Sequence, residues 1–249
     1  VISQKHTSHP VRDYLNSQHW DGTPRVETLF IDYLGAADNE FNRAVARKWL
    51  AAAVARIFSP GCKFDYMPLL IGDQGQKKSM LADKLGRKWY SDSINTVQGK
   101  EAYEQLLGVW IAEMAELAAL RKSEVEAVKH FISKREDRFR VSYGRRVEAF
   151  PRQCVLIGTT NKRDPLNDPT GGRRFWPVET YATKPKKDIA KDFTDSVIGQ
   201  IWAEAVQYYR AGELLYMPPH LEATANKMQR EATEYDDRAG LIHEYLKIM

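Results

Sequence analysis

A glycine-containing segment in the first third of the chain carries residue types that bind phosphate. Residues 71–80 read IGDQGQKKSM, close to the pattern G-x-x-x-x-G-K-[S/T], with Gly72 at the start and Lys78 and Ser79 at the end. In such a loop, backbone N–H groups and a helix N-terminus hold the phosphates, the lysine reaches the outer phosphates, and the hydroxyl ligates Mg²⁺. The segment predicts that ATP and Mg²⁺ are bound. The candidate nucleotide-binding residues are Gly72, Asp73, Gln74, Gly75, Gln76, Lys77, Lys78, Ser79 and Met80.

Position 77 departs from this pattern. Lys77 stands where the second glycine belongs, and that glycine keeps the loop close to the phosphates and free in its backbone angles. A Cβ at this position is expected to crowd the phosphate cradle, and a second cation offsets part of the loss. An ordinary glycine-containing turn between a strand and a helix is the alternative interpretation.

Polar residues follow two further apolar segments. LGVWIAEMAEL places Glu113 and Glu116 at the end of one, and RQCVLIGTTN ends the other in Asn161. A carboxylate beside a phosphate loop holds the metal, and a second one polarises the attacking water. Glu113 is therefore the candidate metal ligand together with Ser79, Glu116 is the candidate base, and Asn161 is placed to hold the water. The alternatives are that the acids cap the next helix and that the asparagine caps a turn.

Two adjacent arginines follow in GGRRFWP. A guanidinium of Arg173 or Arg174 is a candidate to stabilise charge on the transferring phosphate, supplied by the neighbouring subunit of a ring. A solvated or phosphate-binding basic loop is the competing interpretation.

Positive charge gathers between residues 129 and 152. Eight Lys or Arg face three acids there, a net charge of +5, so the rest of the chain sums to −1 out of the total of +4. RFRVSYGRRVEAF alternates around a Tyr-Gly turn, which predicts a hairpin. Arginines interleaved with aromatic rings suit a nucleic-acid backbone, although charge runs are usually solvated faces. The candidate DNA-binding residues are Arg138, Arg140, Tyr143, Arg145 and Arg146.

These segments need a scaffold, and the chain divides into three regions. Residues 1–66 and 181–249 show helical periodicity, while in residues 67–180 short apolar runs alternate with helical patterns. Buried strands alternating with helices predict an α/β fold with a parallel central sheet, flanked here by N-terminal and C-terminal helical regions. The last helical pattern stops without a cap, so a truncated C-terminal region is expected.

Composition narrows the class of protein. The chain has two cysteines, no apolar run near the ~20 residues of a membrane helix, and no signal-peptide pattern at its start, which together predict a cytoplasmic protein with no membrane partner. Its histidines lack metal-ligand spacing, and no serine lies in a G-x-S-x-G elbow.

The order of these motifs resembles the superfamily 3 helicases, a ring-forming AAA+ group, and more closely the virulence-associated protein E family of phages, prophages and pathogenicity islands. The matching stretches cover most of residues 10–210; they are WDGTPR, RKWLAAAVARIFSPG, GDQGQKKS, WIAEMAEL, VSYGRR, GTTN, GGRRFWP and IWAEAVQYY.

This resemblance implies an AAA+-type P-loop core and an ATP-driven replication helicase that works beside a primase or a replication initiator. It also assigns roles: Lys78 and Ser79 bind nucleotide and Mg²⁺, Glu113 and Glu116 form the acidic motif, Asn161 is the sensor, and Arg173 and Arg174 are finger candidates. The sequence departs from the family pattern at Lys77, and it has no primase-like region.

Two functions from different classes follow. The first is an ATPase motor, a homo-oligomeric ring that moves the 139–150 hairpin along single-stranded or forked DNA. The second is a DNA-binding or partner-binding P-loop module that has lost hydrolysis, as Lys77 suggests. Enzyme activity is the favoured expectation, and a small-molecule kinase is disfavoured because the basic hairpin would have no role.

Overall fold

The centre of the protein is a parallel sheet of five strands. The computed structural model describes residues 9–94, 96–115, 122–141, 144, 146–161, 173–224 and 227, with side chains at 122 and 123 left out. The strand order is β2-β3-β6-β1-β7, and every neighbouring pair is parallel. The strands are β1 (Met67–Ile71), β2 (Tyr90–Ser91), β3 (Ile111–Ala115), β6 (Val155–Thr160) and β7 (Phe175–Glu179). The predicted α/β fold with a helix-flanked parallel sheet is confirmed, and it is consistent with a P-loop core.

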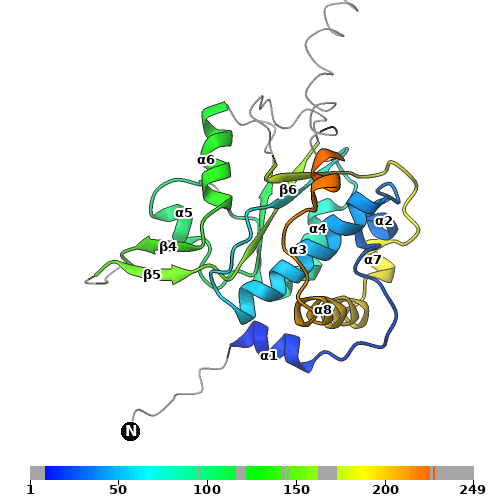
Figure 1. The fold of residues 1–249 in the computed structure, drawn as a ribbon, viewed down its shortest axis with the longest axis horizontal. Helices are drawn as coiled ribbons and strands as arrows, with labels where there is room; N and C mark the ends of the chain where they lie inside the picture. The colour runs from blue at the N-terminus through cyan, green and yellow to red at the C-terminus, as the bar shows by residue number, and fades with distance from the viewer. Residues whose placement is uncertain are drawn as a thin grey trace, which may run out of the picture.

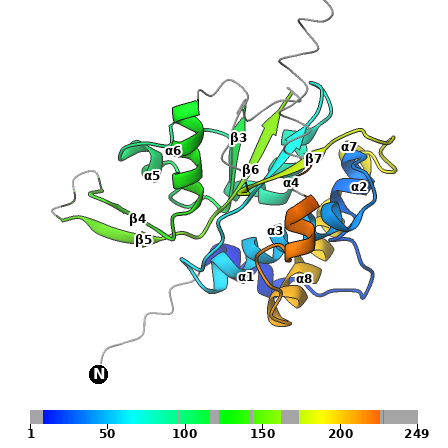
Figure 2. The same cartoon turned by 45° about the horizontal axis from the view of Figure 1, so that its top comes forward.

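Helices cover both faces of this sheet, because alternate residues of a strand point to opposite faces. On β1, Leu70 packs into one apolar cluster, while Leu69 and Ile71 pack into the other. Figures 1 and 2 show the larger helical layer on one side and the smaller layer on the other. The larger layer holds α1 (Pro10–Ser17), α2 (Leu29–Leu34), α3 (Glu40–Phe58), α4 (Lys78–Gly86) and α8 (Asp195–Arg210). The smaller holds α5 (Glu101–Glu104) and α6 (Lys122–Ile132).

Helix α3 lies at the centre of the larger layer. It begins where the side chain of Asn39 accepts a hydrogen bond from the Asn42 backbone N–H, an N-cap that satisfies one free donor. Its alanine-rich middle lets neighbouring elements pack closely, and the indole of Trp49 donates to the Leu156 carbonyl of β6 at 2.9 Å. The apolar cluster around α3 joins residues from all three predicted regions, among them Phe41, Leu70 and Trp202. The region boundaries stay a prediction.

The basic segment forms the expected hairpin beside the sheet. Strands β4 (Glu136–Phe139) and β5 (Glu148–Pro151) pair antiparallel, and the rings of Phe139 and Phe150 stack at 4.7 Å. At its base, Arg152 and Asp137 form a buried ion pair with nitrogen–oxygen distances of 2.9 Å. The first strand ends at Phe139 and the second begins at Glu148, so the described residues between them, 140, 141, 144, 146 and 147, lie outside the paired strands. Part of the expected Tyr-Gly turn lies outside the described residues.

Two further helical segments of the described chain are short. The 3-10 turn η1 (Arg87–Trp89) leads into β2, and α7 (Ile189–Asp192) follows β7. Among the described residues, no helix is long and apolar enough to cross a membrane.

Candidate nucleotide-binding site

The predicted phosphate loop lies between β1 and α4, as the motif requires. β1 ends at Ile71 and α4 begins at Lys78, so residues 72–77 connect a buried strand to a helix N-terminus. A pocket of about 440 Å³ opens at this edge of the sheet, within the ~300–1,000 Å³ range of small-molecule sites. Its lining consists of residues 74–80 of the loop and α4, together with Ala115, Thr159, Thr160 and Asn161.

Lys78 is the buried cation among the described residues of this pocket, which Lys77 also lines. Its ammonium nitrogen donates to the backbone carbonyls of Gly72 at 2.6 Å and Asp73 at 2.8 Å. Burial lowers the pKa of this ammonium, and the carboxylates of Asp73 and Glu113 act in the opposite direction. Two neutral carbonyls are weaker acceptors for a charged donor than a phosphate oxygen. The lysine is therefore positioned to exchange them for a phosphate.

Position 72 requires glycine because of the neighbouring side chains, and not because of its own backbone angles. A Cβ on this residue would overlap the hydroxyl of Thr180 and the side-chain oxygen of Gln76. Those two side chains hydrogen-bond each other, and the Gly72 N–H donates to the Thr160 carbonyl at 3.1 Å. The first glycine of the motif therefore lets the loop close against the ends of β6 and β7.

Lys77 adopts the left-handed backbone conformation, with φ 58° and ψ 25°. This conformation costs a non-glycine residue roughly 1–2 kcal/mol, which gives the physical reason why a glycine fits the position. The ammonium nitrogen of Lys77 lies 2.8 Å from an oxygen of Asp188, which itself caps α7 by accepting from the Ala190 N–H at 2.7 Å. The hydrogen bond from Lys77 is the main cause of the lowered pKa of Asp188. The lysine thus ties the loop to α7, beside a pocket that stays open.

Glu113 connects the loop to two strands. Its Oε1 accepts from the hydroxyls of Ser79 and Thr159, each at 2.6 Å, and its Oε2 accepts from the hydroxyl of Tyr90. The sequence placed this acid at the tip of the strand, and that placement was wrong, because Glu113 is the buried third residue of β3. Helix capping by Glu113 is excluded as well. Its charge is held by three hydroxyls from α4, β6 and β2.

Tyr90 is one described residue of this site that sequence reasoning missed. Burial, followed by the hydrogen bond to Glu113, raises the pKa of its hydroxyl well above the usual range. Tyr90 belongs to a strand of two residues and reaches Glu113 because β2 pairs with β3, with Tyr90 opposite Ile111. No local motif marks it.

The donor set fits a magnesium nucleotide. Ser79 offers a hydroxyl and Glu113 a carboxylate that already touch each other, and Mg²⁺ prefers such hard oxygen ligands, directly or through water. The pocket adds one buried cation for phosphate charge.

The structure brings some candidate residues together and separates others. Asn161 directly follows β6 and lines the pocket. Arg173 and Arg174 directly precede β7 and so lie at the amino ends of the parallel strands, whereas the loop lies at the carboxyl ends. Glu116 lies outside the described residues.

On the hairpin, three of the candidate DNA-binding residues are exposed: Arg138, Arg140 and Arg146. Arg138 pairs with Glu136 at 2.7 Å. Tyr143 and Arg145 lie outside the described part of the chain.

Comparison with known proteins gives two kinds of match. A model of the virulence-associated protein E-like domain matches residues 15–234. The apo structure of the NrS-1 C terminal region (305–718) is similar with 15% identity and a TM-score of 0.56, covering 90% of this chain and 54% of that one. An A form of the same region is similar with 13% identity and a TM-score of 0.53 over the same shares. The chain thus spans about half the length of these structures, which share its fold. No curated protein matches the sequence.

Proposed function

The chain belongs to the virulence-associated protein E-like domain family, and from this premise we propose that it is an ATP-dependent DNA helicase or translocase of superfamily 3 type. One observation carries the proposal. Lys78, Ser79 and Asn161 line one pocket, and the buried carboxylate of Glu113 accepts a hydrogen bond from Ser79. A buried lysine, a hydroxyl–carboxylate pair and a strand-end amide are the parts that phosphoryl transfer to water requires.

Each residue has a task in this reaction. Mg²⁺, when bound with ATP, neutralises charge on the outer phosphates. Ser79 and Glu113 would hold the metal, and Lys78 would hold the outer phosphates. Asn161 orients the attacking water, and Glu116 takes its proton.

The two arginines are proposed to act on a neighbouring subunit. Arg173 and Arg174 precede β7, whereas the pocket lies where β1 and β6 end, so neither arginine serves the pocket of its own chain. A head-to-tail arrangement of subunits can bring the amino ends of the strands of one subunit to the carboxyl ends of the strands of the next, and such interfaces close into rings. A ring of identical chains is therefore the proposed assembly.

The proposed track for DNA is the 136–151 hairpin. Its exposed arginines offer positive charge to DNA phosphates. Contacts between arginines and phosphates weaken with salt and do not depend on base sequence. Closure of neighbouring subunits around bound ATP would move the hairpin along single-stranded or forked DNA. A role in replication of a phage or mobile element, beside a primase or a replication initiator in the cytoplasm, belongs to the same proposal.

The test is ATP hydrolysis with and without single-stranded DNA. Lys78→Ala is expected to lower the DNA-stimulated rate roughly ten- to hundredfold, because it removes a charged hydrogen bond to the phosphates. Lys88→Ala, an exposed lysine just beyond the same helix, is the matched control and should keep the wild-type rate. Equal rates in wild type and Lys78→Ala would refute the motor.

A second function is supported by Lys77. Its strained backbone and its ion pair with Asp188 are consistent with a loop that no longer supports ATP hydrolysis. The protein would then be a DNA-binding or partner-binding P-loop module without hydrolysis.

A further inference from the structure

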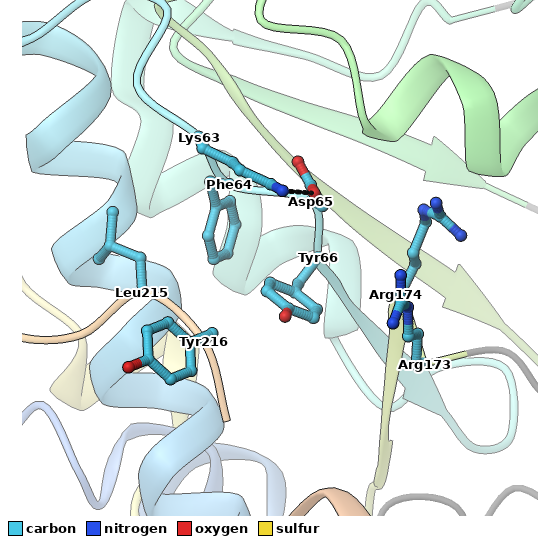
Figure 3. A pocket seen from close by; sticks show the side chains of 8 residues that line it. All are labelled: Lys63, Phe64, Asp65, Tyr66, Arg173, Arg174, Leu215 and Tyr216. Carbon is cyan, nitrogen blue, oxygen red and sulfur yellow. Dashed lines mark ion pairs between the residues drawn. The ribbon is translucent and has the colours of Figure 1, made fainter. Parts of the chain in front are cut away.

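A second pocket, of about 350 Å³, lies at the amino ends of β1 and β7, whereas the phosphate loop lies at the carboxyl end of β1. Three separate segments form it: residues 63–66 before β1, Arg173 and Arg174 before β7, and Leu215 and Tyr216 after α8 (Figure 3). The described residues that line it include no glycine and no helix N-terminus, so its chemistry differs from that of the first pocket.

Positive charge dominates this pocket. Its charged residues are three cations and the carboxylate of Asp65, a net charge of +2. Lys63 pairs with Asp65 at 3.4 Å and is otherwise exposed, and Arg174 donates to the neutral hydroxyl of Ser133 at 2.7 Å. Within the described parts of the chain, neither Arg173 nor Arg174 forms an ion pair. The pocket therefore attracts an anion.

Aromatic rings supply the rest of the lining. The ring of Tyr66 stacks on the buried indole of Trp176, with centroids 4.6 Å apart and planes 18° from parallel. This contact holds Tyr66 in place as a platform. Tyr216 is 51% exposed, and Figure 3 shows Tyr66 between Tyr216 on one side and the two arginines on the other. Rings beside cations are the combination that binds a base and its phosphate.

Hydrogen bonds connect the chain segments that form this pocket to the base of the basic hairpin. The guanidinium of Arg135 donates to the Gly61 carbonyl at 2.8 Å, and the Gly61 N–H donates to the Arg152 carbonyl at 2.9 Å. Arg174 reaches Ser133, which directly follows α6 and precedes the hairpin. One extended polyanion can therefore contact the hairpin arginines and this pocket together.

We propose that this pocket binds one nucleotide unit of a single-stranded nucleic acid. The base stacks on Tyr216 and Tyr66, and the phosphate binds Lys63. The inference rests on the DNA-binding part of the proposed function and adds a second contact to the hairpin. A free mononucleotide has the same chemistry, but the connection to the hairpin favours a strand.

The test measures binding of a labelled oligothymidylate without any ATP, so it does not depend on hydrolysis. Tyr216→Leu keeps apolar bulk but removes the stacking surface, and affinity is expected to fall roughly tenfold. Tyr216→Phe retains the ring and should bind as wild type does. Lys63→Ala should weaken binding and lower the salt slope by about one unit, while Lys191→Ala, an exposed lysine on α7, should change neither.

Cross-linking locates the strand directly. An oligonucleotide carrying 5-iododeoxyuridine is expected to cross-link to peptides that contain Tyr66 or Tyr216. Unchanged affinity in Tyr216→Leu would overturn the proposal, as would cross-links confined to the hairpin. Thymidine monophosphate competing as strongly as the oligonucleotide would likewise overturn it, because the site would then serve free nucleotides. If the Arg138/Arg146 double alanine variant lost binding while Tyr216→Leu and Lys63→Ala bound as wild type does, the hairpin would be the DNA contact. The proposal for this pocket would then be wrong, although DNA binding itself would be supported.

Discussion

The ammonium nitrogen of Lys77 lies 2.8 Å from Oδ2 of Asp188, a residue 111 positions further along the chain. Lys77 is the N-cap of α4 and Asp188 is the N-cap of α7, so one ion pair joins the beginnings of two helices beside the pocket. The residue that breaks the glycine motif therefore has a structural partner of its own.

Lys77→Gly tests whether this arrangement impairs the loop. Glycine relieves the left-handed strain, worth roughly 1 kcal/mol, and loses a partly exposed ion pair, worth at most about 1 kcal/mol. Because the loop already holds the required backbone conformation, we expect the free energy of unfolding to change by less than about 1 kcal/mol. ATP affinity and turnover should stay near wild type, and urea unfolding and ATP titration measure these quantities.

Asp188→Asn is the matched variant, because asparagine keeps the helix cap and loses only the charge. It should leave turnover unchanged as well. Tighter ATP binding together with new turnover in Lys77→Gly would instead favour the module that has lost hydrolysis.

Tyr90→Phe tests the support of the metal ligand. The change removes one of three hydroxyls that hold Glu113 and leaves the ring in place. Loss of such an outer partner typically costs ten- to hundredfold in metal affinity or activity, so the Mg²⁺ concentration for half-maximal ATP hydrolysis is expected to rise about tenfold. A Mg²⁺ titration measures it. Tyr181→Phe, at an exposed tyrosine just beyond β7, is the control, and an unchanged Mg²⁺ requirement in Tyr90→Phe would remove Tyr90 from the site.

Local pattern was enough to predict the loop between β1 and α4 and the pairing of β4 with β5. Gly72, Lys78 and Ser79 are close in sequence, and the strand–helix context on either side of them has its own periodicity. The alternation around the basic segment likewise predicted two paired strands. These features depend on neighbours within about a dozen residues, which a single sequence shows directly.

Long-range contacts account for what the sequence did not predict. Glu113 interrupts an apolar run, and the sequence therefore placed it at the end of its strand. In the folded chain, hydroxyls from three other elements donate hydrogen bonds to this carboxylate and stabilise it within the strand. The pairing of Lys77 with Asp188 depends on how α7 packs. In the second pocket, the sequence pointed to the arginines, while Lys63 and Tyr216 join them only in the folded chain.

Tyr33 predicts how stability depends on alkaline pH. Its ring is buried and meets Phe193 edge-on at 4.7 Å. Burial, followed by the nearby carboxylates of Asp32 and Asp192, raises its pKa to about 12. The unfolded chain loses this proton near pH ~10. Between those values the unfolded state binds fewer protons than the folded state, so the free energy of unfolding falls as pH rises.

Urea unfolding near pH ~9 and pH ~11.5 brackets this window. Wild type should lose stability between the two, with Tyr208 contributing in the same direction because its pKa is also raised to about 12. Tyr33→Phe keeps the ring contact and has no proton to lose, so its stability should fall by a smaller amount. Tyr181→Phe, which removes an exposed hydroxyl, should follow wild type. If wild type and Tyr33→Phe lost the same free energy of unfolding between the two pH values, the Tyr33 hydroxyl would not be the group that titrates. The two proteins differ only in that hydroxyl.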